Sequence, residues 1–166
     1  MAIRKIVTGS HPALRSKAAP VKKISEAVLH LLEDMAETMY EYKGVGLAAP
    51  QIGITRRLIV VDPGEDRLMK LINPQIIEME GSQEGPEGCL SVPGIYGEVP
   101  RATRVVVEAL DPGGKAVRIE AEGFLARILQ HEIDHLEGTL FIDRAVRFFD
   151  PAEESPGEEP PEEEPV

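Results

Sequence analysis

Hydrophobic residues recur at helical spacing near the start of the chain. Between positions 24 and 42 they lie on one face of an α-helix: Ile24, Val28, Leu31, Leu32, Met35, Met39 and Tyr42. Ser25 is a suitable N-cap and Gly44 a suitable stop, so we expect a helix from Ser25 to about Lys43. The opposite, solvated face would carry four polar residues: His30, Asp34, Glu37 and Glu41.

After a segment rich in glycine and proline, the hydrophobic pattern becomes short and β-branched. Four such runs predict strands, at 58–61, 71–77, 105–110 and 115–121. The turn sequence D-P-G-G at 111–114 would join the last two into an antiparallel hairpin.

A second amphipathic helix is expected over 123–136, followed by a short strand or turn at 139–143. The stretch 81–97 is rich in glycine and proline, and we assign no element to it. Because the strands lie between the helices rather than alternating with them, the order favours an α+β fold. We expect antiparallel strands packed around the second helix.

Composition separates a folded body from an acidic tail. The chain has 166 residues, 42% of them hydrophobic, and a net charge of −11. Residues 150–166 hold eight of the 29 acidic residues and none of the 18 basic ones, which leaves the rest at −3. We therefore expect a domain over residues 1–149 and a disordered, proline- and glutamate-rich tail over 150–166. This charge excludes a strongly basic nucleic-acid-binding surface as a bulk feature.

Cysteine content and the start of the chain bear on location. The single cysteine, Cys89, permits no intramolecular disulfide, which fits a reducing compartment. No apolar run follows the first charges as in a secretory signal, and none is long enough for a membrane helix. We expect a cytoplasmic protein without a membrane partner.

The strongest chemical signal is H-E-I-D-H at 131–135, within the second predicted helix. His131 and His135 are four residues apart, so both imidazoles lie on one helix face and can share a metal. Glu132 points roughly 100° around the helix axis, where it can take a proton from water without acting as a ligand.

A catalytic metal held by two histidines needs a third protein ligand. Peptidases with H-E-x-x-H-x-x-G-x-x-H have a histidine where this chain has Phe141, and the glutamates after Glu137 lie in the tail. His11 and His30 have the surroundings of ordinary surface residues. Cys89 remains, in a glycine-flanked segment that would let the backbone approach a metal.

Three blocks together resemble bacterial peptide deformylases. They are G-V-G-L-A-A-P-Q at 44–51, E-G-C-L-S at 87–91 and Q-H-E-I-D-H at 130–135. They occur in the family's order and spacing, and the resemblance covers roughly residues 3–143. It implies a metal-dependent amidase that removes the N-formyl group from the initiator methionine of nascent proteins and releases formate.

The resemblance also implies roles for particular residues. Cys89, His131 and His135 would hold one divalent metal, typically iron(II), with zinc, nickel or cobalt as alternatives. Glu132 would act as general base and then as general acid. The Gln51 side chain and the backbone N–H of Leu90 would stabilise the developing oxyanion.

Substrate contacts are implied in the same way. The peptide backbone would pair with the extended segment from Gly44 to Gly46. The methionine side chain would enter an apolar slot lined by Val45, Phe124 and Ile128. Some family members dock on the ribosome through a basic C-terminal helix, but an acidic tail would be repelled by ribosomal RNA.

Two other interpretations stay open from the sequence. One is an H-E-x-x-H metallopeptidase that cuts internal peptide bonds, although its usual downstream third ligands are missing. The other is a metal-binding protein without catalysis, for which Glu132 would have no use. Metal content, together with turnover of a formylated and an internal peptide, would separate all three.

Overall fold

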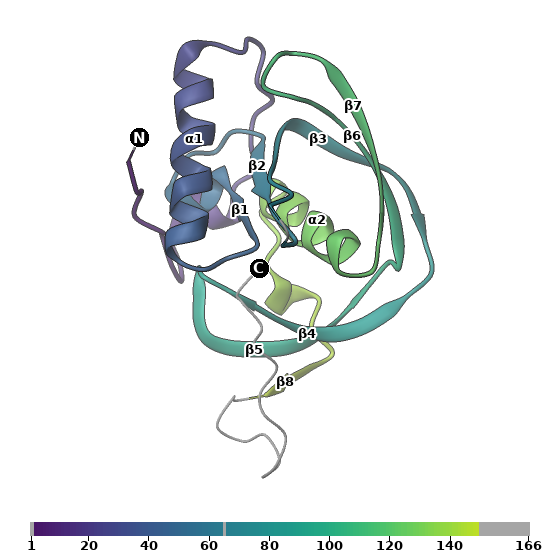
Figure 1. The fold of residues 1–166 in the computed structure, drawn as a ribbon. Helices are drawn as coiled ribbons and strands as arrows, with labels where there is room; N and C mark the ends of the chain where they lie inside the picture. The colour runs from purple at the N-terminus through teal and green to yellow at the C-terminus, as the bar shows by residue number, and fades with distance from the viewer. Residues whose placement is uncertain (1, 65, 150–166) are drawn as a thin grey trace.

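A computed structural model describes residues 2–64 and 66–149 as two helices with two antiparallel sheets (Figure 1). The helices are α1 (Glu26–Glu41) and α2 (Gly123–Leu136). The five-stranded sheet has the order β1 (Gly46–Ala48), β2 (Leu58–Val61), β3 (Met69–Glu80), β6 (Arg104–Leu110) and β7 (Ala116–Glu122). The three-stranded sheet has the order β4 (Gln83–Cys89), β5 (Val92–Arg101) and β8 (Arg147–Phe149). Short 3-10 turns lie at η1 (Pro12–Arg15), η2 (Ala49–Ile52) and η3 (Phe141–Asp143).

The second helix occupies the centre of the molecule. In Figure 1, α2 lies inside the curve of β3, β6 and β7, while β4 and β5 pass beneath it. Its Ala126, Ile128 and Leu129 are fully buried in one cluster with Val105 and Val107 of β6. The predicted α+β fold, with antiparallel strands around this helix, is confirmed.

The first helix begins as predicted, with the Ser25 hydroxyl accepting a hydrogen bond from the Val28 N–H at 3.3 Å. Two residues differ from the expected faces. Asp34 was expected in solvent but is only 7% exposed, because the N-terminal segment lies against the helix and Ala2 N–H donates to its carboxylate at 2.8 Å. Tyr42 was expected on the buried face but is 43% exposed, since the helix has already ended there.

The glycine-rich stretch 81–97 forms β4 and much of β5, although we assigned no element to it. Two of its glycines, Gly88 and Gly97, leave room for side chains that pack against the backbone. A Cβ at Gly88 would lie 2.8 Å from the Tyr96 ring, and one at Gly97 would lie 2.9 Å from the Ala145 methyl group. These contacts are tertiary, so the composition of the segment concealed them.

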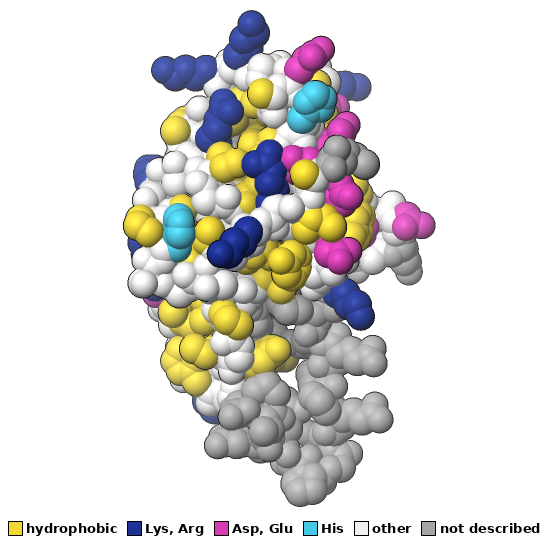
Figure 2. Space-filling model, turned by 90° about the vertical axis from the view of Figure 1, so that its left-hand side faces the viewer, with side chains coloured by type: hydrophobic (Ala, Val, Ile, Leu, Met, Phe, Trp, Pro, Cys, Tyr) yellow, Lys and Arg dark blue, Asp and Glu magenta, His cyan; other side chains and the backbone are white. Residues whose placement is uncertain are grey.

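The remaining expectations near the C-terminus have mixed outcomes. The segment expected as a strand or turn at 139–143 contains the 3-10 turn η3, and the short strand β8 after it was not predicted. The predicted tail, 150–166, lies outside the described residues. In the part of the chain that is described, no helix has the length and apolar character needed to cross a membrane. Basic and acidic side chains are both present on the face in Figure 2, which shows no continuous basic surface.

Candidate metal centre

Two structural elements bring together the three predicted metal ligands. Helix α2 carries His131 and His135, whose ring centroids are 5.0 Å apart, and the end of β4 supplies Cys89. One ligand atom from each residue lies within 4.8 Å of the others, and all three side chains are buried. The Cys89 Sγ is 3.5 Å from His135 Nε2.

The hydrogen bonding of the two His131 ring nitrogens shows whether a metal fits this site. Its Nδ1 lies 2.8 Å from Glu87 Oε1, whereas its buried Nε2 has no hydrogen-bond partner among the described residues. A buried ring nitrogen is ordinarily satisfied, and a metal would satisfy this one. One thiolate and two imidazoles, with a fourth position open, are a suitable donor set for a catalytic divalent transition metal. The residues therefore fit such an ion.

Glu87 is the functional residue that the sequence analysis missed. We quoted it within the E-G-C-L-S block but gave it no role. It is 1% exposed and accepts hydrogen bonds from Arg101 Nε and Nη2 at 2.9 and 2.8 Å, and a further one from Arg127. The sequence gives one sign of its role, since Glu87 lies two residues before the only cysteine. Its arginine partners lie in distant segments of the chain, so the sequence does not reveal their contact with it.

The surrounding charges keep Glu87 ionised and orient His131. Burial by itself raises the pKa of the Glu87 carboxyl, but hydrogen bonds from Arg101 and His131 outweigh burial and hold that pKa well below its usual range. An ionised Glu87 accepts a hydrogen bond from His131 Nδ1–H, which directs Nε2 at the ligand cluster. In the metal-free site, burial lowers the pKa of His131, but the neighbouring Cys89 thiol and Glu87 carboxylate outweigh burial and raise it to about 10, so a metal would take the place of the Nε2 proton.

Glu132 follows His131 on α2 and is not a member of the ligand group. It is fully buried, and neither carboxylate oxygen has a hydrogen-bond partner in the described part of the chain. Burial raises the pKa of Glu132 to about 7, against an opposing contribution from His131. A pKa near neutrality suits a group that takes up and returns a proton. The backbone of β1 packs directly against the Glu132 side chain. A Cβ atom added at Gly46 would lie only 2.5 Å from Glu132 Oε2.

The Gln51 side chain is fixed beside the cysteine. It is fully buried, and its Oε1 accepts a hydrogen bond from the Ala48 N–H at 3.0 Å. This bond orients the amide so that Nε2 donates to Cys89 Sγ at 3.4 Å and Ser91 Oγ at 3.3 Å. Leu90 follows Cys89 directly, at the turn between β4 and β5. Both predicted oxyanion donors therefore belong to segments that meet at the candidate ligands.

The predicted substrate residues fall into two groups. Val45 is 6% exposed and Ile128 is fully buried, and both belong to the cluster that packs around α2. Phe124 lies in the first turn of α2 and is 49% exposed, outside that cluster. Gly46 is the first residue of β1, and Gly44 lies two residues before it. In the described sheet, β1 is an edge strand whose one partner is β2. An edge strand leaves backbone groups free to pair with an extended peptide.

Comparison with known proteins identifies the family. A sequence model of the polypeptide deformylase family matches residues 3–149. The chain belongs to this family. A peptide deformylase of Halothermothrix orenii is 60% identical over 146 residues, which cover 87% of this chain and 93% of that protein. A peptide deformylase of Caldanaerobacter subterraneus is 56% identical over 153 residues, 92% of this chain and 96% of that one.

Solved structures agree with the sequence comparison. The crystal structure of peptide deformylase from Thermotoga maritima has a TM-score of 0.85 and 44% identity, covering 88% of this chain and 99% of that one. The deformylase from Synechococcus elongatus, solved in complex with actinonin, has a TM-score of 0.83 and 41% identity, covering 87% and 79%.

Family membership confirms the expected class of enzyme. The chain is a metal-dependent hydrolase that removes the N-formyl group from nascent polypeptides. The findings favour this interpretation over an H-E-x-x-H endopeptidase and over a metal-binding protein without catalysis.

Proposed function

We propose that Cys89, His131 and His135 hold one divalent metal, iron(II) in the cell, at which the formyl group of formyl-methionyl peptides is hydrolysed. The observation that carries this proposal is the convergence of these three buried side chains, with the buried Glu132 next to His131 on α2. The choice of iron rests on resemblance to the family, because the same donor set also accepts zinc, nickel or cobalt. When bound, the metal would supply Lewis acidity, which lowers the pKa of water towards neutrality.

Glu132 carries the proton in this mechanism. Its carboxylate accepts a proton from water as the water oxygen bonds to the formyl carbon. When the carbon–nitrogen bond breaks, the same carboxyl group returns the proton to the departing amine. The products are formate and a peptide with a free methionine amino group. The pKa of about 7, raised by burial, makes Glu132 suited to both transfers.

Gln51 and Leu90 would stabilise the negative charge that develops on the formyl oxygen. The Gln51 amide is held in one orientation by Ala48, with its Nε2 directed at the cysteine. The backbone N–H of Leu90 would be the second donor. Donors fixed before the reaction need little rearrangement when the charge appears, so their stabilising effect is large.

Replacing Gln51 with Leu is expected to slow deformylation by about 10²–10³-fold, the usual cost of losing one oxyanion donor. Metal content should stay unchanged, because Gln51 is not a ligand. Steady-state kinetics and metal analysis of the purified variant would measure both. The matched control is Ser91→Ala, which removes the other acceptor of the Gln51 amide and keeps the amide itself. Normal turnover in Gln51→Leu would remove this residue from the mechanism.

The substrate would bind along β1. Its backbone would pair with the segment from Gly44 to Gly46, and Val45, Phe124 and Ile128 would line the slot for the methionine side chain. The free edge of β1 and the half-exposed Phe124 ring support this arrangement. The burial of Val45 and Ile128 also serves core packing.

A comparison of acyl groups tests the proposed function. Formyl-Met-Ala-Ser should be hydrolysed. Acetyl-Met-Ala-Ser should react about 10–200-fold more slowly, the usual range for one added methyl group, or more slowly still if the cavity wall is rigid. The reason is that a formyl carbon carries only hydrogen, so a narrow cavity beside Cys89 and Gln51 can exclude larger acyl groups. Formate and free amine release would be measured, with an internal peptide as a further substrate. Near-equal rates for the two acyl groups would contradict the proposal.

We also propose that residues 1–149 form the catalytic domain and that the acidic tail over 150–166 is dispensable for it. Ribosome association would then use a surface of the domain, since the tail and ribosomal RNA have like charge. The cytoplasm is the proposed location, because formylated chains emerge from the ribosome there.

A further inference from the structure

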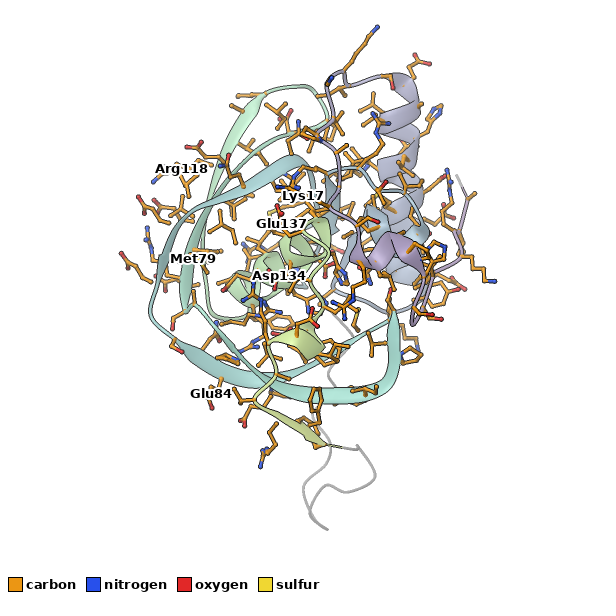
Figure 3. The ribbon with its side chains drawn as sticks, turned by 180° about the vertical axis from the view of Figure 1, so that it is seen from behind. Lys17, Met79, Glu84, Arg118, Asp134 and Glu137 are labelled. Carbon is orange, nitrogen blue, oxygen red and sulfur yellow. The ribbon has the colours of Figure 1, made fainter. Side chains whose placement is uncertain are left out.

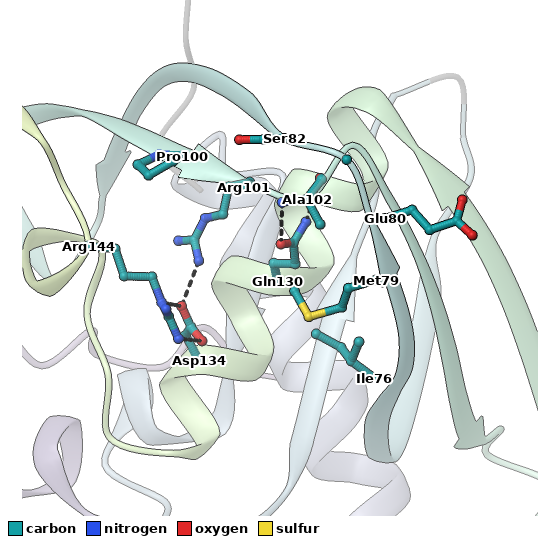
Figure 4. Close-up of a pocket in the computed structure, with 11 residues that line it drawn as sticks. Ile76, Met79, Glu80, Ser82, Pro100, Arg101, Ala102, Gln130, Asp134 and Arg144 are labelled. Carbon is teal, nitrogen blue, oxygen red and sulfur yellow. Dashed lines mark hydrogen bonds and ion pairs between the residues drawn. The ribbon is translucent and has the colours of Figure 1, made fainter.

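A cavity of about 450 Å³ lies against α2 at Gln130 and Asp134, and charged residues form one of its walls (Figure 4). Apolar side chains from Ile76 and Met79 lie on the other side. Figure 3 shows Asp134 near the middle of this rear face, with Met79 to one side. Figure 4 shows that Asp134 is held between two guanidinium groups, those of Arg101 and Arg144.

Arg144 forms a two-bond contact with the Asp134 carboxylate. Its Nε lies 2.6 Å from Oδ2 and its Nη2 lies 3.0 Å from Oδ1. This forked geometry fixes the plane of the carboxylate, which a single bond does not. Arg144 lies in the segment after η3, outside the metal-binding helix. It therefore connects the C-terminal part of the fold to α2.

The Asp134 carboxylate also contacts a second arginine, Arg101. Asp134 Oδ2 lies 2.6 Å from Arg101 Nη1, and Arg101 in turn donates two hydrogen bonds to Glu87. Glu87 Oε1 lies 2.8 Å from His131 Nδ1. A continuous row of charge-assisted hydrogen bonds thus runs from a half-exposed arginine to the imidazole of a candidate metal ligand.

Burial along this row explains why its outer end matters. The exposed fraction of the side chain falls from 49% at Arg144 to 15% at Asp134, 3% at Arg101 and 0% at Glu87. Without Arg144, Asp134 can turn towards the cavity and water. Arg101 would then keep Glu87 but lose Asp134, and a buried cation that loses one of its two anions shifts or is destabilised.

We propose that Arg144 is a positioning residue for the metal site. It holds Asp134 against Arg101, which keeps Glu87 in the place where it orients His131. This inference rests on the proposed ligand set. It assigns the segment after η3, which carries Arg144, a part in retaining the metal.

The competing explanation is that Arg144 merely anchors its own segment. The chain offers a matched control, because Arg15 forms a comparable two-bond pair with Asp143 of η3. The Arg15 side chain is 46% exposed, close to the 49% of Arg144. This pair anchors the same segment from another side and does not contact Glu87, Arg101 or Asp134.

The test uses full-length enzyme loaded with nickel(II) and measures the rate of metal release to a chelator. Loss of a residue that supports a metal ligand, as Glu87 supports His131, typically weakens binding by about 10–100-fold. Arg144 lies three contacts further out than Glu87, so Arg144→Ala should release nickel about 3–10-fold faster. Arg144→Lys should give an intermediate rate, because an ammonium group cannot form the fork. Arg15→Ala should release nickel at the wild-type rate. The melting temperature of the metal-free form should fall at least as far in Arg144→Ala as in Arg15→Ala, because only Arg144 supports the buried row.

A double-mutant comparison tests the route. Because Arg144 acts through Asp134, adding Arg144→Ala to Asp134→Asn should not accelerate nickel release further. Equal release rates for Arg144→Ala and Arg15→Ala would overturn the proposal, as would additive effects in the double variant. Nickel retention by His131→Ala would instead show that the ligand set is wrong, a result distinct from failure of the Arg144 inference alone.

Discussion

His131→Ala is expected to abolish tight metal binding and, with it, deformylation. His131 supplies one of three ligand atoms that lie within 4.8 Å of one another, so its loss leaves only Cys89 and His135. The substitution also leaves the Glu87 carboxylate without the ring that it orients. Two protein ligands do not hold a divalent ion tightly, because catalytic sites use three and leave a fourth position open. Metal content after desalting and formate release from formyl-Met-Ala-Ser would measure the two effects.

The control for this experiment is another histidine of the same chain. His30 lies on α1 and is exposed, away from the candidate ligands. His30→Ala should keep wild-type metal content and wild-type turnover. If His131→Ala retained one metal per chain, the proposed ligand set would be wrong.

Glu132→Gln is expected to retain the metal and to lose about 10²–10⁴-fold in turnover, the usual contribution of a general acid–base group. The amide has nearly the size and shape of the carboxylate, so the packing of Gly46 against this side chain should persist. It cannot accept a proton from water, however, and it cannot return one to the amine. The values of kcat and metal content would be measured on the same preparation.

A second glutamate near the end of the same helix provides the comparison. Glu137 is exposed and forms an ion pair with Arg57, remote from the ligand group. Glu137→Gln should leave turnover unchanged. If Glu132→Gln lost the metal, Glu132 would be a ligand or a structural residue rather than the group that moves the proton.

Local patterns in the sequence were sufficient to predict both helices and much of the large sheet. The bounds of α2 follow from its helical periodicity, and that periodicity also puts His131 and His135 on one face. Cys89 was identified because the other candidate ligands were missing or lay at the surface, and because its block resembles the family.

The sequence could not reveal what depends on contacts between distant segments. Glu87 and His131 are 44 residues apart, and Arg101 reaches Glu87 from a third position in the chain. No periodicity within one segment encodes such a pairing. The same reason applies to β4 and β5, whose glycines make room for Tyr96 and Ala145, and to Asp34, which is covered by the N-terminal segment.

Because of where Cys89 lies in the fold, a bound ion would affect folding as well as catalysis. The cysteine belongs to the three-stranded sheet, whereas both histidines belong to a helix that packs on the five-stranded sheet. An ion held by all three therefore crosslinks the two sheets, and its binding free energy is added to that of their association. Metal loading is therefore expected to stabilise the contact between the two sheets, and loss of the ion to weaken that contact.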